Sequence, residues 1–180
     1  VLDGGLTSVA DVSTVLPGHT QAIVAFKWGI AVGGDMAAFV AHLADGTEAM
    51  VAADLATGDL TVLADSTTIL PGRTTPMDRF GDGGWAAGPD RVVFTAFSTT
   101  DFTSGLYVWD GNQVQPVAVQ GDAFDGAAFG TAEFGPESLN GRYLAAEVGL
   151  IGGVGGLYLI DLDAVTPLFS DGFEHGDLGA

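Results

Sequence analysis

Short apolar segments separated by glycine-rich turns run along the whole chain, and they fall into two matching sets. The first set comprises residues 36–41, 91–97 and 142–148, and the second, which ends each time in aspartate, comprises residues 49–54, 106–110 and 157–161. Apolar, β-branched and aromatic residues in segments of this length are typical of half-buried strands. No window of about 11 residues has apolar side chains at helical spacing without an intervening glycine or proline. The pattern therefore predicts strands joined by turns, and no substantial helix.

One longer segment recurs at a fixed distance along the chain. Residues 6–18, which read LTSVADVSTVLPG, align without a gap with residues 60–72, which read LTVLADSTTILPG. The step from Gly18 to Gly72 is repeated from Gly72 to Gly126, where a weaker copy at residues 114–126 ends. Such a period indicates a repeat architecture in which each unit is one supersecondary structure. Repeat units are predicted at residues 19–72, 73–126 and 127–180, and residues 1–18 are predicted to supply the outer strand of a preceding unit, at residues 6–11.

Each unit also contains a segment that combines aromatic residues with glycine, ahead of its first apolar strand. These segments, residues 26–29, 80–85 and 134–140, are predicted to be the first strand of each unit. The Pro-Gly pairs that end at Gly18 and Gly72 suit type II turns between units, because proline presets its own φ and glycine accepts a positive φ.

Four antiparallel strands in each unit, repeated at a long period, are typical of a β-propeller blade. A β-sandwich would give strands without that period, and a β-solenoid, the alternative, usually has coils shorter than the unit seen here. The predicted fold is all-β: a propeller-type array of about three four-stranded antiparallel units, which can form part of a larger ring.

The composition limits the partners that the chain can have. Five lysine and arginine residues against 23 aspartate and glutamate residues give a net charge of −18, which repels nucleic acid and anionic membranes. Apolar residues make up 47% of the chain and charged residues only 16%, so the chain is expected to fold. The absence of cysteine excludes disulfides, thiolate metal sites and cysteine nucleophiles. The longest apolar stretch, residues 145–160, is too short for a membrane helix, and no membrane insertion is expected.

The second and third units carry a recognisable blade motif. The part written F-G-x-P-S-L-N is matched by Phe134, Gly135, Ser138, Leu139 and Asn140, with Pro136 one place early, and the part written G-L-Y-V-x-D-G by Gly105, Leu106, Tyr107, Asp110 and Gly111. In these residues the chain resembles a family of secreted bacterial β-propeller-like repeat proteins. The first unit departs from the motif, with Lys27 and Trp28 where Phe-Gly would stand.

Residues 169–180 resemble a motif found near the C-terminus of many secreted Gram-negative proteins. The two resemblances imply a propeller-like fold and a secreted, extracellular location. They imply no catalytic residue. The chain begins without a signal-peptide pattern and is interpreted as a mature chain or as a piece of a longer one.

No motif marks a catalytic centre. His19, His42 and His175 occupy different positions of the repeat, so they are interpreted as surface histidines and not as a ligand set. The Gly-x-Ser-x-Gly motif of many hydrolases does not occur. The glycine cluster at residues 152–156 precedes a predicted strand instead of a helix, so it is interpreted as a hairpin loop and not as a phosphate-binding loop.

Two ligands are compatible with the composition. Calcium prefers oxygen ligands, and the closely spaced carboxylates of Asp171, Glu174 and Asp177 are weak candidates, although their spacing fits no known calcium loop. Most acidic residues in turns are solvated, so no cofactor is assigned. Carbohydrate is the second hypothesis, because Phe80, Trp85, Phe97, Tyr107 and Trp109 could stack on sugar rings, although aromatic residues at repeated strand positions usually belong to the core.

The ionisable residues of the first strands bear on whether the chain is an enzyme. In a propeller enzyme such residues converge at one end of successive first strands, whereas these strands offer Lys27, Asp82 and Glu137, three unlike groups with no evident partner. The sequence therefore favours a non-catalytic secreted binding or scaffold module. It would act through self-assembly with other copies of itself, or as part of a larger propeller in a longer chain. The alternative is an extracellular propeller hydrolase or lyase that acts on a polysaccharide.

Overall fold

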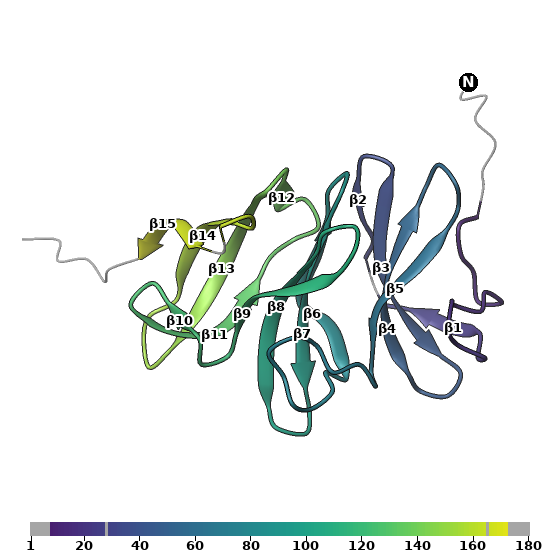
Figure 1. Ribbon diagram of the computed structural model, residues 1–180, viewed down its shortest axis with the longest axis horizontal. Helices are drawn as coiled ribbons and strands as arrows, with labels where there is room; N and C mark the ends of the chain where they lie inside the picture. Colours follow the sequence, from purple (N-terminus) through teal and green to yellow (C-terminus); the bar gives the residue numbers. More distant parts are fainter. Residues whose placement is uncertain (1–7, 28, 165, 173–180) are drawn as a thin grey trace, which may run out of the picture.

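The computed structural model describes residues 8–27, 29–164 and 166–172, and these residues form an all-β structure without a helix. Their strands make up three antiparallel sheets, which lie side by side along the long axis of the molecule (Figure 1). We call the sheets blades 1, 2 and 3 in chain order. The described residues thus contain no helix that could cross a membrane. The predicted fold class is confirmed.

Each blade is a meander of consecutive strands. Blade 1 contains β1 (Ile23–Phe26), β2 (Ala31–Gly33), β3 (Met36–Leu43), β4 (Glu48–Asp54) and β5 (Leu60–Asp65). Blade 2 contains β6 (Arg79–Ala87), β7 (Val92–Ser98), β8 (Thr103–Trp109) and β9 (Val114–Val119). Blade 3 contains β10 (Ala123–Phe124), β11 (Ala127–Glu133), β12 (Leu139–Asn140), β13 (Tyr143–Ile151), β14 (Gly156–Asp161) and β15 (Thr166–Gly172). The four main strands pair in the orders β1-β3-β4-β5, β6-β7-β8-β9 and β11-β13-β14-β15.

The sequence repeat is also a repeat of hydrogen bonds. The carboxylate of Asp11 accepts the Ser13 N–H at 2.8 Å, and one repeat later the carboxylate of Asp65 accepts the Thr67 N–H at the same distance. Both are Asx turns, in which a short carboxylate caps the N–H two residues ahead. The hydroxyl and N–H of Ser13 hold the pKa of Asp11 below its usual value, because they stabilise the charged carboxylate.

The segment after each of these turns has the same structure as well. Gly18 and Gly72 have φ angles of 81° and 82°, as the predicted type II turns require. Leu16, Leu70 and Phe124 occupy one position of the repeat, and all three are buried. Leu70 lies in the apolar cluster between blades 1 and 2, and Phe124 in the cluster between blades 2 and 3. Leu16 lies in a third cluster, on the outer face of blade 1.

The predicted outer strand at residues 6–11 is not observed where the structure describes it. Residues 8–11 form no strand, and residues 6 and 7 lie outside the described part of the chain. A strand needs a hydrogen-bonded neighbour, and no described strand pairs with this segment. Val9 and Ala10 pack instead against the apolar cluster on the outer face of blade 1, together with Leu16.

The first strand of each blade is interrupted at the same place. β1 and β2 both pair with β3, β11 and β12 both pair with β13, and the longer β6 changes register within residues 81–84. The aromatic and glycine segments, predicted as first strands, thus contain the interruptions. The prediction of a strand over residues 134–140 is wrong for most of that range: residues 134–138 form a turn, which the Gly135 N–H closes on Ser138 Oγ at 3.0 Å. The first strand of blade 3 is β11.

Candidate functional site

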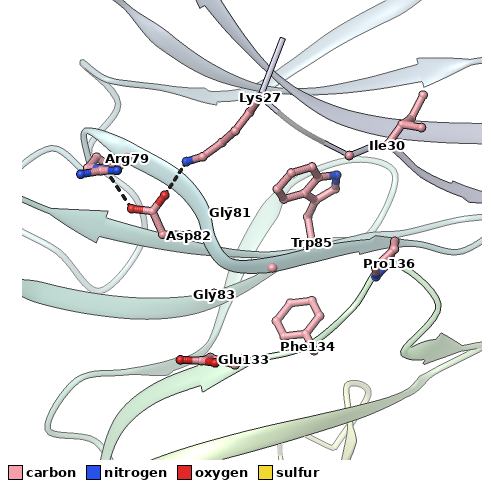
Figure 2. Close-up of a pocket in the computed structure, with 12 residues that line it drawn as sticks. Lys27, Ile30, Arg79, Gly81, Asp82, Gly83, Trp85, Glu133, Phe134 and Pro136 are labelled. Atoms are coloured by element: carbon pink, nitrogen blue, oxygen red, sulfur yellow. Dashed lines mark hydrogen bonds and ion pairs between the residues drawn. The ribbon is translucent and has the colours of Figure 1, made fainter.

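The three interruptions come together and line a pocket of about 660 Å³ (Figure 2). Lys27 and Ile30 come from blade 1, residues 81–85 from blade 2, and Phe134 and Pro136 from blade 3. A pocket of this volume has the size of a small-molecule site. The strands β1 and β6 are edge strands of their sheets, and β11 is bordered only by the two-residue β10, so the pocket lies along the edge where all three blades meet.

Glycine and threonine shape the blade 2 wall of the pocket. Residues 81–84 stand opposite Thr95 alone on β7, so β6 bulges outward there. Thr95 holds the bulge, because its Oγ1 accepts the Gly83 N–H at 2.9 Å and donates to the Gly84 carbonyl at 3.3 Å. Gly81 and Gly84 have φ angles of 70° and 126°, which side chains other than glycine rarely adopt.

Lys27 joins blade 1 to this bulge. Its Nζ donates to the Phe80 carbonyl at 2.7 Å and lies 2.5 Å from Asp82 Oδ1 and 3.3 Å from Glu48 Oε1. On the other side of Asp82, Arg79 Nε lies 2.9 Å from Oδ2. Figure 2 shows Lys27 and Arg79 converging on the Asp82 carboxylate from two directions. The charges of this part of the pocket are therefore paired with one another.

Glu48 completes the link from within blade 1. Its buried carboxylate accepts the Phe80 N–H at 2.5 Å, and His42 Nδ1 lies 3.6 Å from it. Lys27 and Glu48 thus bind both main-chain polar groups of Phe80, the residue that immediately precedes the bulge. Because buried charges are stable only when they are paired and hydrogen-bonded, this arrangement fixes the relative position of the two blades.

Trp85 forms the apolar floor of the pocket and is almost fully buried. Its indole Nε1 donates to the Ala38 carbonyl at 3.1 Å, which anchors it on blade 1. Gly29 and Gly81 lie against its ring, and Gly81 leaves no room there for a Cβ atom. Trp85 is therefore held in place by backbone from both blades.

Blade 3 approaches the bulge through its backbone. The Phe134 N–H donates to the Gly83 carbonyl at 2.8 Å, and a Cβ at Gly83 would collide with the Ala132 carbonyl oxygen. A second, smaller pocket of about 280 Å³ lies between blades 2 and 3 and shares Asp82 and Glu133 with the first. Two carboxylate residues therefore contribute to both pockets.

The ionisable residues predicted at the first strands are only partly brought together. Lys27 and Asp82 line the pocket and form an ion pair, so the expectation that they lack a partner is wrong. Glu137 is exposed and does not line the pocket. Arg79 and Glu133 line it instead. Sequence reasoning missed them because it placed the first strand of blade 3 too late, and because Arg79 precedes the segment that the aromatic and glycine pattern marks.

Of the five aromatic residues considered for sugar stacking, three belong to the core. Phe80, Trp85 and Tyr107 are buried in the cluster between blades 1 and 2, and Trp109 packs against it. Phe97 lines the smaller pocket. An aromatic ring that the sequence did not single out for this role, Phe134, lines the larger one.

The described residues include only some of the candidate metal ligands. His19 lies 3.5 Å from Asp65 and His42 lies beside Glu48, while His175 is outside the described range. Within residues 8–27, 29–164 and 166–172, no three side chains of metal-ligating type gather as a metal site would require. Of the calcium candidates, Glu174 and Asp177 lie outside the described residues, and only the backbone of Asp171, in β15, lies within them. Residues 152–155 form the loop between β13 and β14, in agreement with the hairpin interpretation.

Comparison with known proteins supports the fold. The sequence matches no protein-family model, and no curated protein matches it significantly. Among solved structures, the chain is similar to the β-propeller domain of the trilobed protease from Pyrococcus furiosus, described as having an open velcro topology, with a TM-score of 0.52 and 11% sequence identity. The match covers 86% of this chain and 45% of that chain, so this chain spans about half the length of the one it resembles. The three blades of this chain thus have the β-propeller fold.

Proposed function

We propose that this chain is a secreted, non-catalytic binding module, which works as a three-blade part of a larger β-propeller and holds a ligand at the interruptions of its first strands. The observation that carries the proposal is the convergence of these interruptions, one from each blade, on a single pocket of about 660 Å³.

The pairing of charges in the pocket supports a non-catalytic role. A general base or nucleophile needs a free acceptor, whereas both oxygens of Asp82 are engaged by the cations of Lys27 and Arg79. Lys27 is the only lysine of the chain, and its ammonium is bound by Phe80, Asp82 and Glu48. These groups position the bulge and leave no activated nucleophile among them.

The end faces of the array support a larger ring. On strand β8 of blade 2, the side chains that face blade 3 are buried, and Leu106 is 0% exposed. The equivalent side chains on strand β14 of blade 3 have no following blade among the described residues to cover them, and Leu157 is 52% exposed. Apolar sheet faces that are covered inside a repeat array need a neighbour at its ends. The 45% coverage of the propeller from Pyrococcus furiosus fits three blades of a ring about twice as large.

The proposal also includes a secreted location and a class of ligand. Secretion rests on the resemblance of the blade motif and of residues 169–180 to secreted bacterial proteins. Carbohydrate is one ligand class to test, and Phe134 with the charged groups of Asp82 and Glu133 offers the combination of apolar ring and hydrogen-bonding groups that sugars require. Calcium binding at Asp171, Glu174 and Asp177 is tested by adding and chelating calcium during thermal unfolding.

The proposal is tested by a ligand screen with paired variants of the pocket. We expect a glycan array or a small-molecule library to give ligands that bind the wild-type chain and are lost in Phe134→Ala. Binding should persist in Phe102→Ala, which removes an exposed phenylalanine outside the pocket. Ligands that bind both variants equally, or no ligand in either library, would contradict a binding role for the pocket.

The alternative, a propeller hydrolase or lyase, is favoured by one observation: the residues Asp82 and Glu133 border the same two pockets. Two carboxylates flanking a bond are the usual arrangement in glycoside hydrolysis. Turnover of a polysaccharide panel that disappears in Asp82→Asn or Glu133→Gln, while Glu137→Gln retains it, would establish this alternative in place of our proposal.

A further inference from the structure

The two ends of the blade array expose apolar residues at positions that are buried in its interior. At the blade 3 end, Leu159 is 37% exposed, whereas its equivalent in blade 2, Val108, is 6% exposed. The equivalence follows from strand pairing, since Ala145 faces Leu159 as Val93 faces Val108. Leu157 is exposed beside it.

The blade 1 end shows the complementary feature. Phe26 of β1 is 41% exposed, whereas Phe80, one repeat later on β6, is fully buried. The aromatic contacts of the two residues correspond as well. Phe26 lies 5.5 Å from Phe39 between ring centroids, and Phe80 lies 6.2 Å from Phe94. Phe26 is therefore the uncovered copy of a residue that a preceding blade covers inside the array.

The interface between blades 1 and 2 shows how the two end faces fit together. Met50 stands in blade 1 where Leu157 stands in blade 3, because Met50 faces Val40 as Leu157 faces Glu147. Met50 and Phe80 belong to one apolar cluster. By the same geometry, Leu157 of one chain would meet Phe26 of a chain docked in continuation of the array.

We propose that the chain associates head to tail with a second copy of itself, with the β14 face of blade 3 packed on Phe26 and the outer side of blade 1 of the other copy. Such a contact is heterologous, and it closes into a ring only if the rotation between blades brings the last blade back to the first. Two copies supply six blades. Three blades match a little under half of the propeller from Pyrococcus furiosus, so closure by two copies is the expected outcome.

This inference rests on the part of the proposed function that places the three blades in a larger ring, and it names the partner. Residues 8–11 lie against the outer face of blade 1, and β15 already holds the outer-strand position of blade 3. The contact between the two copies is therefore made by sheet faces, and no strand is added to either sheet.

Native mass spectrometry and light scattering of the 180-residue chain test the proposal. We expect a particle of twice the mass of the chain. The double variant Leu157→Glu/Leu159→Glu and the single variant Phe26→Glu should each be monomeric, because each introduces charge into a different side of the same contact. Ile69→Glu is the matched control, since Ile69 is exposed to a similar extent on the linker between blades 1 and 2 and lies at neither end. The far-ultraviolet circular dichroism of each variant confirms folding.

A monomeric wild-type chain would overturn the proposal. So would a dimer that survives Phe26→Glu, because it would have a symmetric contact through blade 3 alone. An equimolar mixture of the double variant with Phe26→Glu should form mixed dimers, since one intact contact remains between them; its failure to do so would also contradict head-to-tail association. Ligand binding is measured separately on the monomeric variants, because the pocket lies within one chain. A wild-type chain that binds ligand but stays monomeric removes this inference and leaves the binding role intact.

Discussion

Lys27 of blade 1 and Asp82 of blade 2 form an ion pair of 2.5 Å across the interface of the two blades. The pair is not isolated, because the same ammonium binds the Phe80 carbonyl and Glu48. One lysine therefore links the core side of blade 1 to the pocket side of blade 2. Its substitution should affect both stability and the shape of the pocket.

We expect Lys27→Met to lower the free energy of unfolding by about 3 kcal/mol, because it leaves the buried carboxylate of Glu48 without its cation. Urea denaturation measures the change. Adding Glu48→Gln should recover part of the loss, since the second substitution removes the unpaired charge. Arg79→Met is the control: Arg79 is half exposed, and its loss should cost less than about 1 kcal/mol. Equal costs for Lys27→Met and Arg79→Met would contradict the role given to Lys27.

The close approach of blades 2 and 3 gives a second prediction. A Cβ at Gly83 would collide with the Ala132 carbonyl, so Gly83→Ala must separate the two blades and should cost about 1–3 kcal/mol. Gly135→Ala, in the neighbouring interruption, is the matched control, because only Ser138 Oγ lies within 4 Å of a Cβ there, at 3.9 Å. Thermal unfolding of both variants measures the difference in stability. Gly83→Ala alone should also bind ligand more weakly, because the separation of the blades changes the pocket.

The repeat gives a third prediction, which compares Leu16 with Leu70. The two leucines occupy one repeat position and are 1% and 2% exposed, so truncation of either to alanine should cost about 2–4 kcal/mol. Leu70→Ala leaves a cavity between two blades, whereas Leu16→Ala loosens the segment that covers blade 1. Amide hydrogen exchange should therefore increase in β3 and β4 alone for Leu16→Ala, and across blades 1 and 2 for Leu70→Ala. Identical exchange patterns would contradict the placement of the two leucines in different apolar clusters.

Much of the fold could be predicted because the same pattern of strands and turns recurs three times in the sequence. The matching segments around Leu16 and Leu70 indicated the length of the repeat. Strands β3, β7 and β13 form close to the apolar segments that predicted them. The prediction failed where one pattern has two structural meanings. Aromatic residues beside glycine suit a first strand, yet in Phe134 and Gly135 they begin a turn, since Pro136 cannot donate to a ladder and the Ser138 hydroxyl closes a local hydrogen bond.

The site was harder to predict than the fold, because its contacts join residues from different blades. Lys27 and Asp82 were singled out, but their pairing depends on the distance between adjacent blades, which no sequence period supplies. Nothing in the sequence marked Glu48 as part of the site, because a glutamate at the start of a strand is normally solvated. In the structure its buried carboxylate binds the Phe80 N–H of blade 2 and the Lys27 ammonium of blade 1. Contacts within a blade follow from periodicity, whereas contacts between blades follow from packing.

The last prediction concerns Tyr107, whose buried hydroxyl has no hydrogen-bond partner among the described residues. Burial raises the pKa of Tyr107 to about 12 from its ordinary value of 10.0, because the phenolate would lose its hydration; nearby Arg73 opposes this effect, and Asp122 adds to it.

The pKa of Tyr107 is higher in the folded state than in the unfolded state, so the folded state holds the phenol proton more tightly. The free energy of unfolding is therefore unaffected by this group below pH 10 and falls as the pH rises toward 12. Tyr107→Phe should therefore reduce the fall in the free energy of unfolding over this range. At neutral pH it should leave that free energy unchanged or raise it by about 1 kcal/mol, because no hydrogen bond is lost. Denaturation at a series of pH values measures both effects, and the phenolate absorbance difference between the wild-type and variant proteins gives the titration of Tyr107 itself. A wild-type phenolate that forms at pH 10 would show that the hydroxyl reaches water.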